Sequence, residues 1–145
     1  MPIKKTKPIE ILLVEDNPSD VRLIMEVFKD SHIQHNLVVA TDGLQALEIL
    51  KPENKSPNIY RPNFIILDLN LPKKSGGEVL KEIKKDDSLK NIPIVILTTS
   101  SAEEDIEKMY HNSVNAFLTK PIYLDEFIEV VKSIQNFWLK NVKLP

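Results

Sequence analysis

Several side chains capable of chemistry stand directly after short apolar segments of the chain. Two acids follow the first segment, one acid follows the third, hydroxyls end the fourth and a lysine follows the fifth: Glu15, Asp16, Asp68, Thr98, Thr99 and Lys120. Carboxylates without histidine or cysteine among them are hard oxygen ligands, which favour Mg²⁺ or Mn²⁺. A single acid at a strand end is often only a solvated turn residue, but the repeated pattern favours a metal site.

The apolar segments have the length and composition of buried strands. They are continuous rather than alternating and rich in β-branched residues, as is typical of a parallel sheet covered on both faces. The segments are 9–14, 36–40, 63–68, 93–97 and 115–118. Helical patterns separate them, so the sequence predicts a doubly wound (βα)5 α/β fold with a five-stranded parallel sheet. In such sheets, ligands bind at the carboxyl ends of the strands, where these polar residues stand.

The predicted helices carry capping signals at their starts. Asn17 is placed as an N-cap before Pro18, Ser75 and Glu78 form a capping box, and the segment 101–110 repeats this box. Apolar stripes predict the buried faces of two further helices; their members are Leu44, Leu47 and Leu50, and then Leu124, Phe127, Ile128, Val131, Ile134 and Trp138.

Composition narrows the possible classes of protein. A chain of 145 residues predicts one domain, which we place at 9–138 between an N-terminal arm at 1–8 and a C-terminal tail at 139–145. The net charge of −2 argues against nucleic-acid binding, and the lack of cysteine excludes disulfides and thiolate chemistry. We expect a cytoplasmic protein, because the sequence offers neither a signal peptide nor an apolar run of about 20 residues.

Taken together, these motifs resemble the receiver domain of response regulators in two-component signalling. The resemblance covers about residues 9–138. It depends on the acid pair Glu15–Asp16, the aspartate Asp68 of "DLNLP", Thr98 with the small residue Thr99 beside it, and the "KP" of Lys120–Pro121. It implies a flavodoxin-like, CheY-like fold and a signalling phosphoprotein of a phosphorelay rather than a metabolic enzyme. It also implies a cis peptide bond between Lys120 and Pro121.

The resemblance assigns Asp68 as the phosphoacceptor, which receives a phosphoryl group from the phosphohistidine of a sensor histidine kinase. Glu15, Asp16, Asp68 and the backbone carbonyl of Asn70 would hold Mg²⁺ (or Mn²⁺). Asn70 also stands at the position that tunes the lifetime of the phosphate in relatives. Weak hydrolysis of this phosphate is expected to act as a timer.

The remaining implied roles concern the bound phosphate. Phosphoryl transfer requires neutralisation of the charge on the phosphoryl oxygens. Lys120, the Thr98 hydroxyl and the Thr99 backbone N–H would bind those oxygens. Thr98 and the aromatic Phe117 would then act as a switch, changing the surface formed by the helix at 101–110, the strand at 115–118 and the last helix.

The chain ends soon after the last helix, so we expect the signal to leave through protein binding rather than through an output domain. Val130, Phe137 and Trp138 add apolar surface beyond the core stripe, which predicts a homodimer or partner face. The segment 51–63, with three prolines, and the aromatic C-terminus resemble single-domain regulators that include partners of bacterial phytochromes.

Three other interpretations are open. A Mg²⁺-dependent phosphatase that forms an aspartyl phosphate would normally have a second acid where Asn70 stands, and a cap domain for which this chain is too short. An FMN carrier would have a loop rich in Ser, Thr and Gly in place of "EDNPSD". A receiver-like domain could also bind its partners without phosphorylation, although every residue needed for phosphorylation is present.

Overall fold

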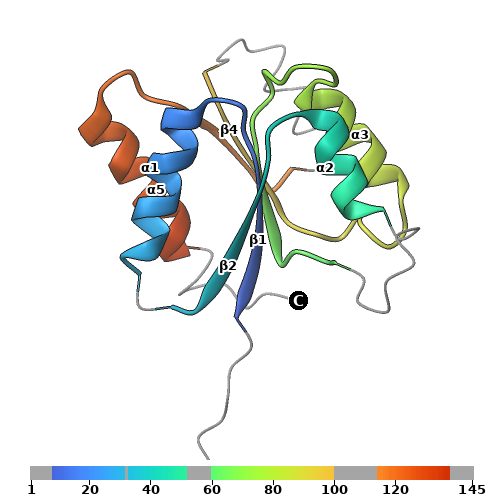
Figure 1. Ribbon diagram of the computed structural model, residues 1–145, viewed down its shortest axis with the longest axis horizontal. Helices are drawn as coiled ribbons and strands as arrows, with labels where there is room; N and C mark the ends of the chain where they lie inside the picture. Colours follow the sequence, from blue (N-terminus) through green and yellow to red (C-terminus); the bar gives the residue numbers. More distant parts are fainter. Residues whose placement is uncertain (1–7, 32, 52–59, 100–113, 138–145) are drawn as a thin grey trace, which may run out of the picture.

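Five parallel strands form the central sheet of the computed structural model, which describes residues 8–31, 33–51, 60–99 and 114–137 (Figure 1). The strands are β1 (Ile9–Val14), β2 (His35–Ala40), β3 (Phe64–Leu67), β4 (Ile94–Thr98) and β5 (Ala116–Thr119). Their order is β2-β1-β3-β4-β5, and each neighbouring pair is parallel. The predicted doubly wound parallel sheet is confirmed.

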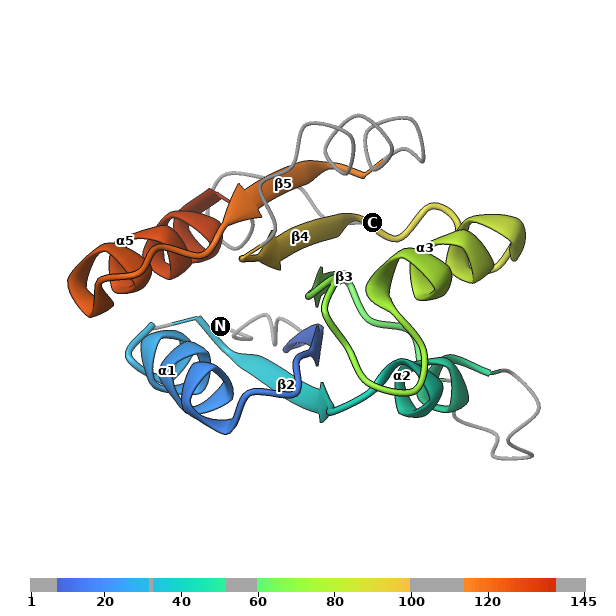
Figure 2. The same cartoon turned by 90° about the horizontal axis from the view of Figure 1, so that it is seen from above.

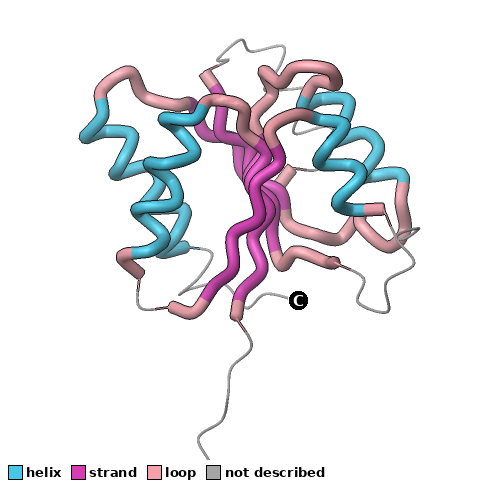
Figure 3. Tube along the Cα trace, in the orientation of Figure 1, coloured by secondary structure: helices cyan, strands magenta, loops and turns pink. Residues whose placement is uncertain are grey.

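Helices cover both faces of this sheet (Figures 1 and 2). The helices α1 (Pro18–Lys29) and α5 (Leu124–Gln135) lie on one face, and α2 (Gly43–Leu50) and α3 (Gly76–Lys85) lie on the other. Figure 3 shows the strands as a single layer between the two helical layers. The helix predicted over 101–110 lies outside the described residues. Within the described parts of the chain, no helix is long and apolar enough to span a membrane.

Alternation along the strands divides the core into two apolar layers. Leu12 and Val14 of β1 pack with the layer that contains α2 and α3, while Ile11 and Leu13 pack with α1 and α5. All four side chains are at most 1% exposed. A buried aliphatic side chain contributes about 1.5–3 kcal/mol, so these layers fix the register of the strands and the position of their ends.

Side chains at the carboxyl edge of the sheet cap three helices. Asn17 accepts hydrogen bonds from the backbone N–H groups of Ser19 and Asp20, as its predicted N-cap role requires. Ser75 accepts from the N–H of Glu78, which confirms that capping signal. A third cap, Asp42 at the start of α2, was not predicted. Each cap joins a strand end to a helix with a defined geometry.

Three local expectations are wrong. Leu44 is 46% exposed and Leu124 is 66% exposed, so neither belongs to the buried stripe of its helix. Both stand in the first turn of a helix, and Leu124 lines a groove beside Leu23 of α1 instead of entering the core. The Lys120–Pro121 peptide bond is trans rather than cis. Most of the extended segment predicted at 51–63 lies outside the described residues.

Candidate functional site

Three carboxylates meet at the carboxyl ends of β1 and β3. These strands are neighbours, while β2 lies on the other side of β1, so the site occupies the point where the strand order reverses. Carboxylate oxygens of Glu15, Asp16 and Asp68 lie within 4.8 Å of one another. Glu15 is 1% and Asp68 5% exposed, whereas Asp16 is open to solvent. The sequence prediction that these acids converge is confirmed.

The ammonium group of Lys120 lies among the acids. Its Nζ is 2.5 Å from Glu15 Oε1, 3.0 Å from Asp68 Oδ2 and 2.9 Å from Asp20 Oδ2. The backbone N–H of Lys120 donates to the carbonyl of Thr98 at 2.7 Å, which holds the end of β5 beside β4. The lysine side chain is only 5% exposed, so its charge is neutralised by these contacts rather than by water.

Burial and pairing shift the pKa values of Glu15 and Asp68 in opposite directions. Burial raises the pKa of Glu15 to about 7; the hydrogen bond with Lys120 lowers this pKa, and the charge of Asp68 raises it, but neither outweighs burial. Burial would also raise the pKa of Asp68, but hydrogen bonds from the Asn70 N–H, Lys120 and Thr98 outweigh it and lower the pKa. Asp68 is therefore the ionised member of the buried pair.

The pKa of Lys120 is raised, although burial acts against this. Hydrogen bonds to Glu15, Asp20 and Asp68 favour the charged ammonium form more strongly than burial disfavours it. Lys120 therefore remains a cation, and among the described residues it is the one cation that pairs with Glu15, Asp20 and Asp68. The excess negative charge and the all-oxygen ligand set of this cluster fit a hard divalent cation.

Asn70 connects the acid cluster to the end of β4. Its backbone N–H donates to Asp68 Oδ1 at 3.1 Å. Its side-chain amide donates to Thr99 Oγ1 at 3.2 Å and to Thr98 Oγ1 at 3.4 Å. Thr98 is fully buried, while Thr99 is exposed. The structure thus brings both threonines to the acids, as the sequence predicted.

Close backbone packing fixes the loop that follows Asp68. A Cβ atom added to Gly76 would overlap the carbonyl oxygen of Asp68, and one added to Gly43 would overlap the carbonyl oxygen of Lys74. Lys73 has a positive φ of 66°, and its Nζ lies 3.6 Å from the capping carboxylate of Asp42. The loop is therefore held between the first turns of α2 and α3.

Apart from Thr98, the described residues assigned to signal output belong to the apolar layers or to the surface. Phe117 is partly buried and packs against the apolar layer of α2 and α3. Val130 is partly buried against the opposite layer, and Phe137 is 55% exposed. Trp138 lies outside the described residues. The sequence prediction missed Asp20, although the carboxylate of Asp20 contacts Lys120.

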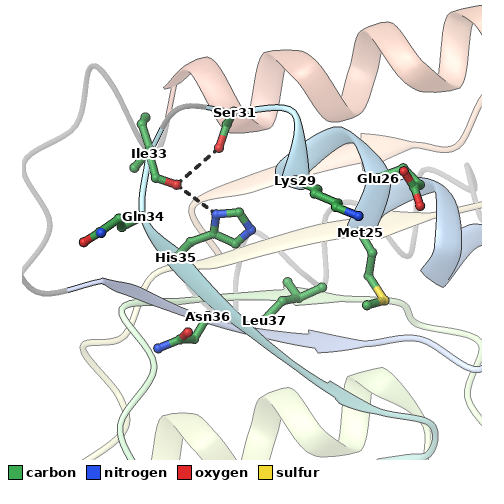
Figure 4. Close-up of a pocket in the computed structure, with 9 residues that line it drawn as sticks. All are labelled: Met25, Glu26, Lys29, Ser31, Ile33, Gln34, His35, Asn36 and Leu37. Atoms are coloured by element: carbon green, nitrogen blue, oxygen red, sulfur yellow. Dashed lines mark hydrogen bonds between the residues drawn. The ribbon is translucent and has the colours of Figure 1, made fainter.

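A separate concavity of about 610 Å³ lies between the end of α1 and the start of β2 (Figure 4). Ser31 Oγ and His35 Nδ1 both point at the carbonyl oxygen of Ile33 there, at 3.4 and 3.0 Å. Lys29 and Met25 line its α1 side. It lies at the amino end of β2, so it is separate from the acid cluster.

Comparison with known proteins identifies the family. The response regulator receiver domain matches residues 11–132. The chain belongs to this family. Response regulator Rcp1 of Synechocystis sp. PCC 6803 is 49% identical over 138 residues, which cover 95% of this chain and 94% of Rcp1.

Solved structures of receiver proteins are closely similar. The Mn²⁺-bound form of Rcp1 has a TM-score of 0.91 at 49% identity and covers 95% of this chain and 99% of its own. The phosphorylated cyanobacterial phytochrome response regulator RcpA also has a TM-score of 0.91, at 46% identity, and covers 96% and 99%. This receiver domain therefore belongs to a two-component signalling protein with an acid cluster suited to a divalent metal.

Proposed function

We propose that this receiver domain accepts a phosphoryl group on Asp68 from a sensor histidine kinase in a Mg²⁺-dependent reaction. The observation that carries the proposal is the contact between Lys120 Nζ and Asp68 Oδ2, at 3.0 Å inside a cluster of acids. An ionised carboxylate is the nucleophile that acyl-phosphate formation needs, and a fixed cation beside it can receive the charge of the incoming group.

In the transfer step, a carboxylate oxygen of Asp68 bonds to phosphorus while the bond from phosphorus to the kinase's histidine nitrogen breaks. The leaving imidazole takes up a proton. Phosphoryl transfer depends mainly on in-line positioning and on neutralisation of charge. Lys120, the Thr98 hydroxyl and the Thr99 backbone N–H supply that neutralisation from the protein.

Glu15, Asp16, Asp68 and the backbone carbonyl of Asn70 are the groups that would hold the metal. Bound there, Mg²⁺ or Mn²⁺ supplies positive charge to the phosphoryl oxygens. The proposal is supported by the mutual approach of the three carboxylates and by the raised pKa of Glu15, which reflects the cost of burying a second negative charge beside Asp68.

The direct test is the intact mass of the protein after incubation with acetyl phosphate. We expect one phosphoryl adduct on wild type with Mg²⁺, and none after chelation or in Asp68→Asn. Asp87→Asn is a matched control, because Asp87 is an exposed acid that follows α3. An adduct that persists in Asp68→Asn would refute the assignment.

Asn70 is proposed to set the lifetime of the phosphate. Its amide contacts both threonine hydroxyls beside Asp68, which supports a role next to the acyl phosphate. Weak self-hydrolysis would then limit the signal in time. In Asn70→Ala, the half-life of the adduct should change severalfold; an unchanged half-life would remove Asn70 from this role.

The kinase partner is proposed to be a phytochrome. The support is similarity to RcpA, a phytochrome response regulator, at 46% identity over almost the whole chain. Transfer from a phosphorylated phytochrome kinase should then be much faster than transfer from an unrelated histidine kinase. Equal rates from both donors would contradict this choice of partner.

The output is proposed to pass through the surface that contains β5 and α5. Phe117 and Thr98 would shift when phosphate binds, and Val130, Phe137 and Trp138 would form a homodimer or partner face. Phe137 is 55% exposed, which supports an apolar contact. Gel filtration should show a dimer that Phe137→Ser weakens, with Ser133→Ala at an exposed position of α5 as the control. A monomer at every concentration, with or without phosphorylation, would exclude the homodimer.

A further inference from the structure

The contact between Asp20 and Lys120 joins two distant parts of the chain. Asp20 stands in the first turn of α1, where Asn17 accepts a hydrogen bond from its backbone N–H. Its Oδ2 lies 2.9 Å from Lys120 Nζ, and its side chain is 21% exposed. An acid in a first turn is usually explained by the helix dipole. Here the carboxylate is also directed to the buried ammonium group.

The ammonium group of Lys120 has three N–H donors, and the structure supplies three carboxylates for them. Glu15 and Asp68 are almost fully buried and belong to the proposed metal-binding group. Asp20 is the third acceptor, and it is not one of the acids that lie together as a candidate metal site in the described chain. Asp20 can therefore keep its hydrogen bond to Lys120 when the other two carboxylates engage a metal and a phosphoryl group.

We propose that Asp20 is a positioning residue that anchors Lys120 beside Asp68, so that the ammonium is in place when the phosphoryl group arrives. This inference rests on the proposed phosphoacceptor function. Without Asp20, the remaining partners of Lys120 among the described residues are Glu15 and Asp68, and both would bind new ligands during the reaction. Misplacement of a charge by about 1 Å is enough to slow an otherwise intact site.

Two substitutions separate positioning from charge. Asp20→Asn removes the negative charge but keeps an oxygen that can accept a hydrogen bond from Lys120. Asp20→Ala removes both. At saturating Mg²⁺, the rate of phosphoryl gain from acetyl phosphate should fall about tenfold in Asp20→Ala, the low end for a hydrogen bond to a charged group. In Asp20→Asn it should stay within about threefold of wild type, because the anchor is retained.

A second measurement follows the lysine without any phosphate. The ¹⁵N–¹H NMR signal of the Lys120 ammonium should be visible in wild type, because three acceptors shield its protons from exchange with water. The signal is assigned by its absence in Lys120→Met. We expect it to persist in Asp20→Asn and to disappear in Asp20→Ala. Both variants lack the acid in the first turn of α1. Thermal unfolding of both therefore serves as a control for the effect of this loss on stability.

The outcomes are distinct. Slow phosphoryl gain in Asp20→Ala alone, with loss of the ammonium signal, supports the anchor. Equal slowing in both variants would assign Asp20 a purely electrostatic role and overturn the proposal, as would a wild-type rate in Asp20→Ala. If wild type forms no adduct, the phosphoacceptor proposal fails by itself, and the ammonium signal still decides whether Asp20 holds Lys120.

Discussion

Charged side chains are buried at the carboxyl end of the sheet and exposed at its amino end. At the carboxyl end, Glu15, Asp68 and Lys120 are nearly inaccessible to water. At the amino end, Glu26 and Lys29 beside the concavity of Figure 4 remain exposed. The Ser31 and His35 side chains there contact the nearby carbonyl of Ile33, and the contact of the Asn36 amide with the Glu10 carboxylate lies at the surface. Burial of a charge costs several kcal/mol unless it is paired, so the carboxyl end bears a cost that the amino end avoids.

This difference indicates that the carboxyl end of the sheet gives up folding stability in order to bind a ligand. The same apolar strands run from one end of the sheet to the other, so the apolar core does not cause the difference between the two ends. The cause lies in the residues that follow the strands, which gather acids and fix the adjoining loop by close packing. Three changes in stability test this comparison.

The largest effect is expected from Gly76→Ala. The added Cβ would overlap the backbone carbonyl of Asp68, which cannot move without displacing the end of β3. We expect a loss of about 3 kcal/mol in the free energy of unfolding, measured by urea denaturation. Gly77→Ala, one position along α3, should instead be neutral or stabilising by up to about 1 kcal/mol, through helix propensity. Equal losses in both would mean that the close approach to Asp68 does not matter.

A divalent metal should stabilise the carboxyl end. At a Mg²⁺ or Mn²⁺ concentration about 100 times the dissociation constant, the free energy of unfolding should rise by about 2.7 kcal/mol. Asp16→Asn should remove most of this gain, because Asp16 is the solvent-facing member of the acid cluster. Asp30→Asn, an exposed acid at the other end of α1, should retain the full gain. The same gain in all three proteins would place the metal elsewhere.

The smallest effect is a pH dependence of the metal-free protein. Burial raises the pKa of Glu15 from 4.5 to about 7, so between these values the folded protein holds a proton that the unfolded chain has lost. Stability is therefore favoured below this interval and lost as pH rises through it. Glu15→Gln should lack this slope. Chemical denaturation in chelator across the interval measures the difference, and a flat or rising difference would contradict it.

Much of this architecture could be predicted from the order of residues. Continuous apolar segments identified all five strands, and Asn17 and Ser75 identified two helix starts. Parallel strands bring their carboxyl ends to one edge, so the convergence of Asp68 and Lys120 followed from topology alone.

Side-chain direction could not be predicted in the same way. Asp20 has the residue type expected in any first turn, and no local pattern indicates that it faces a lysine 100 residues away. The contacts of the Asn70 amide with two hydroxyls at the end of β4 could not be predicted for the same reason. The exposed positions of Leu44 and Leu124 depend on where each helix begins relative to the sheet, and periodicity does not specify this.

The separation of the site residues along the chain has a consequence for cooperativity. Lys120 is 52 residues from Asp68 and 100 from Asp20, and it is held at the end of the edge strand β5. Opening of β5 alone would therefore remove the cation and leave the acids facing one another. We expect a bound metal and phosphate to slow hydrogen exchange in β5 as well as beside the acids, so that occupancy of the site and docking of this edge strand rise and fall together.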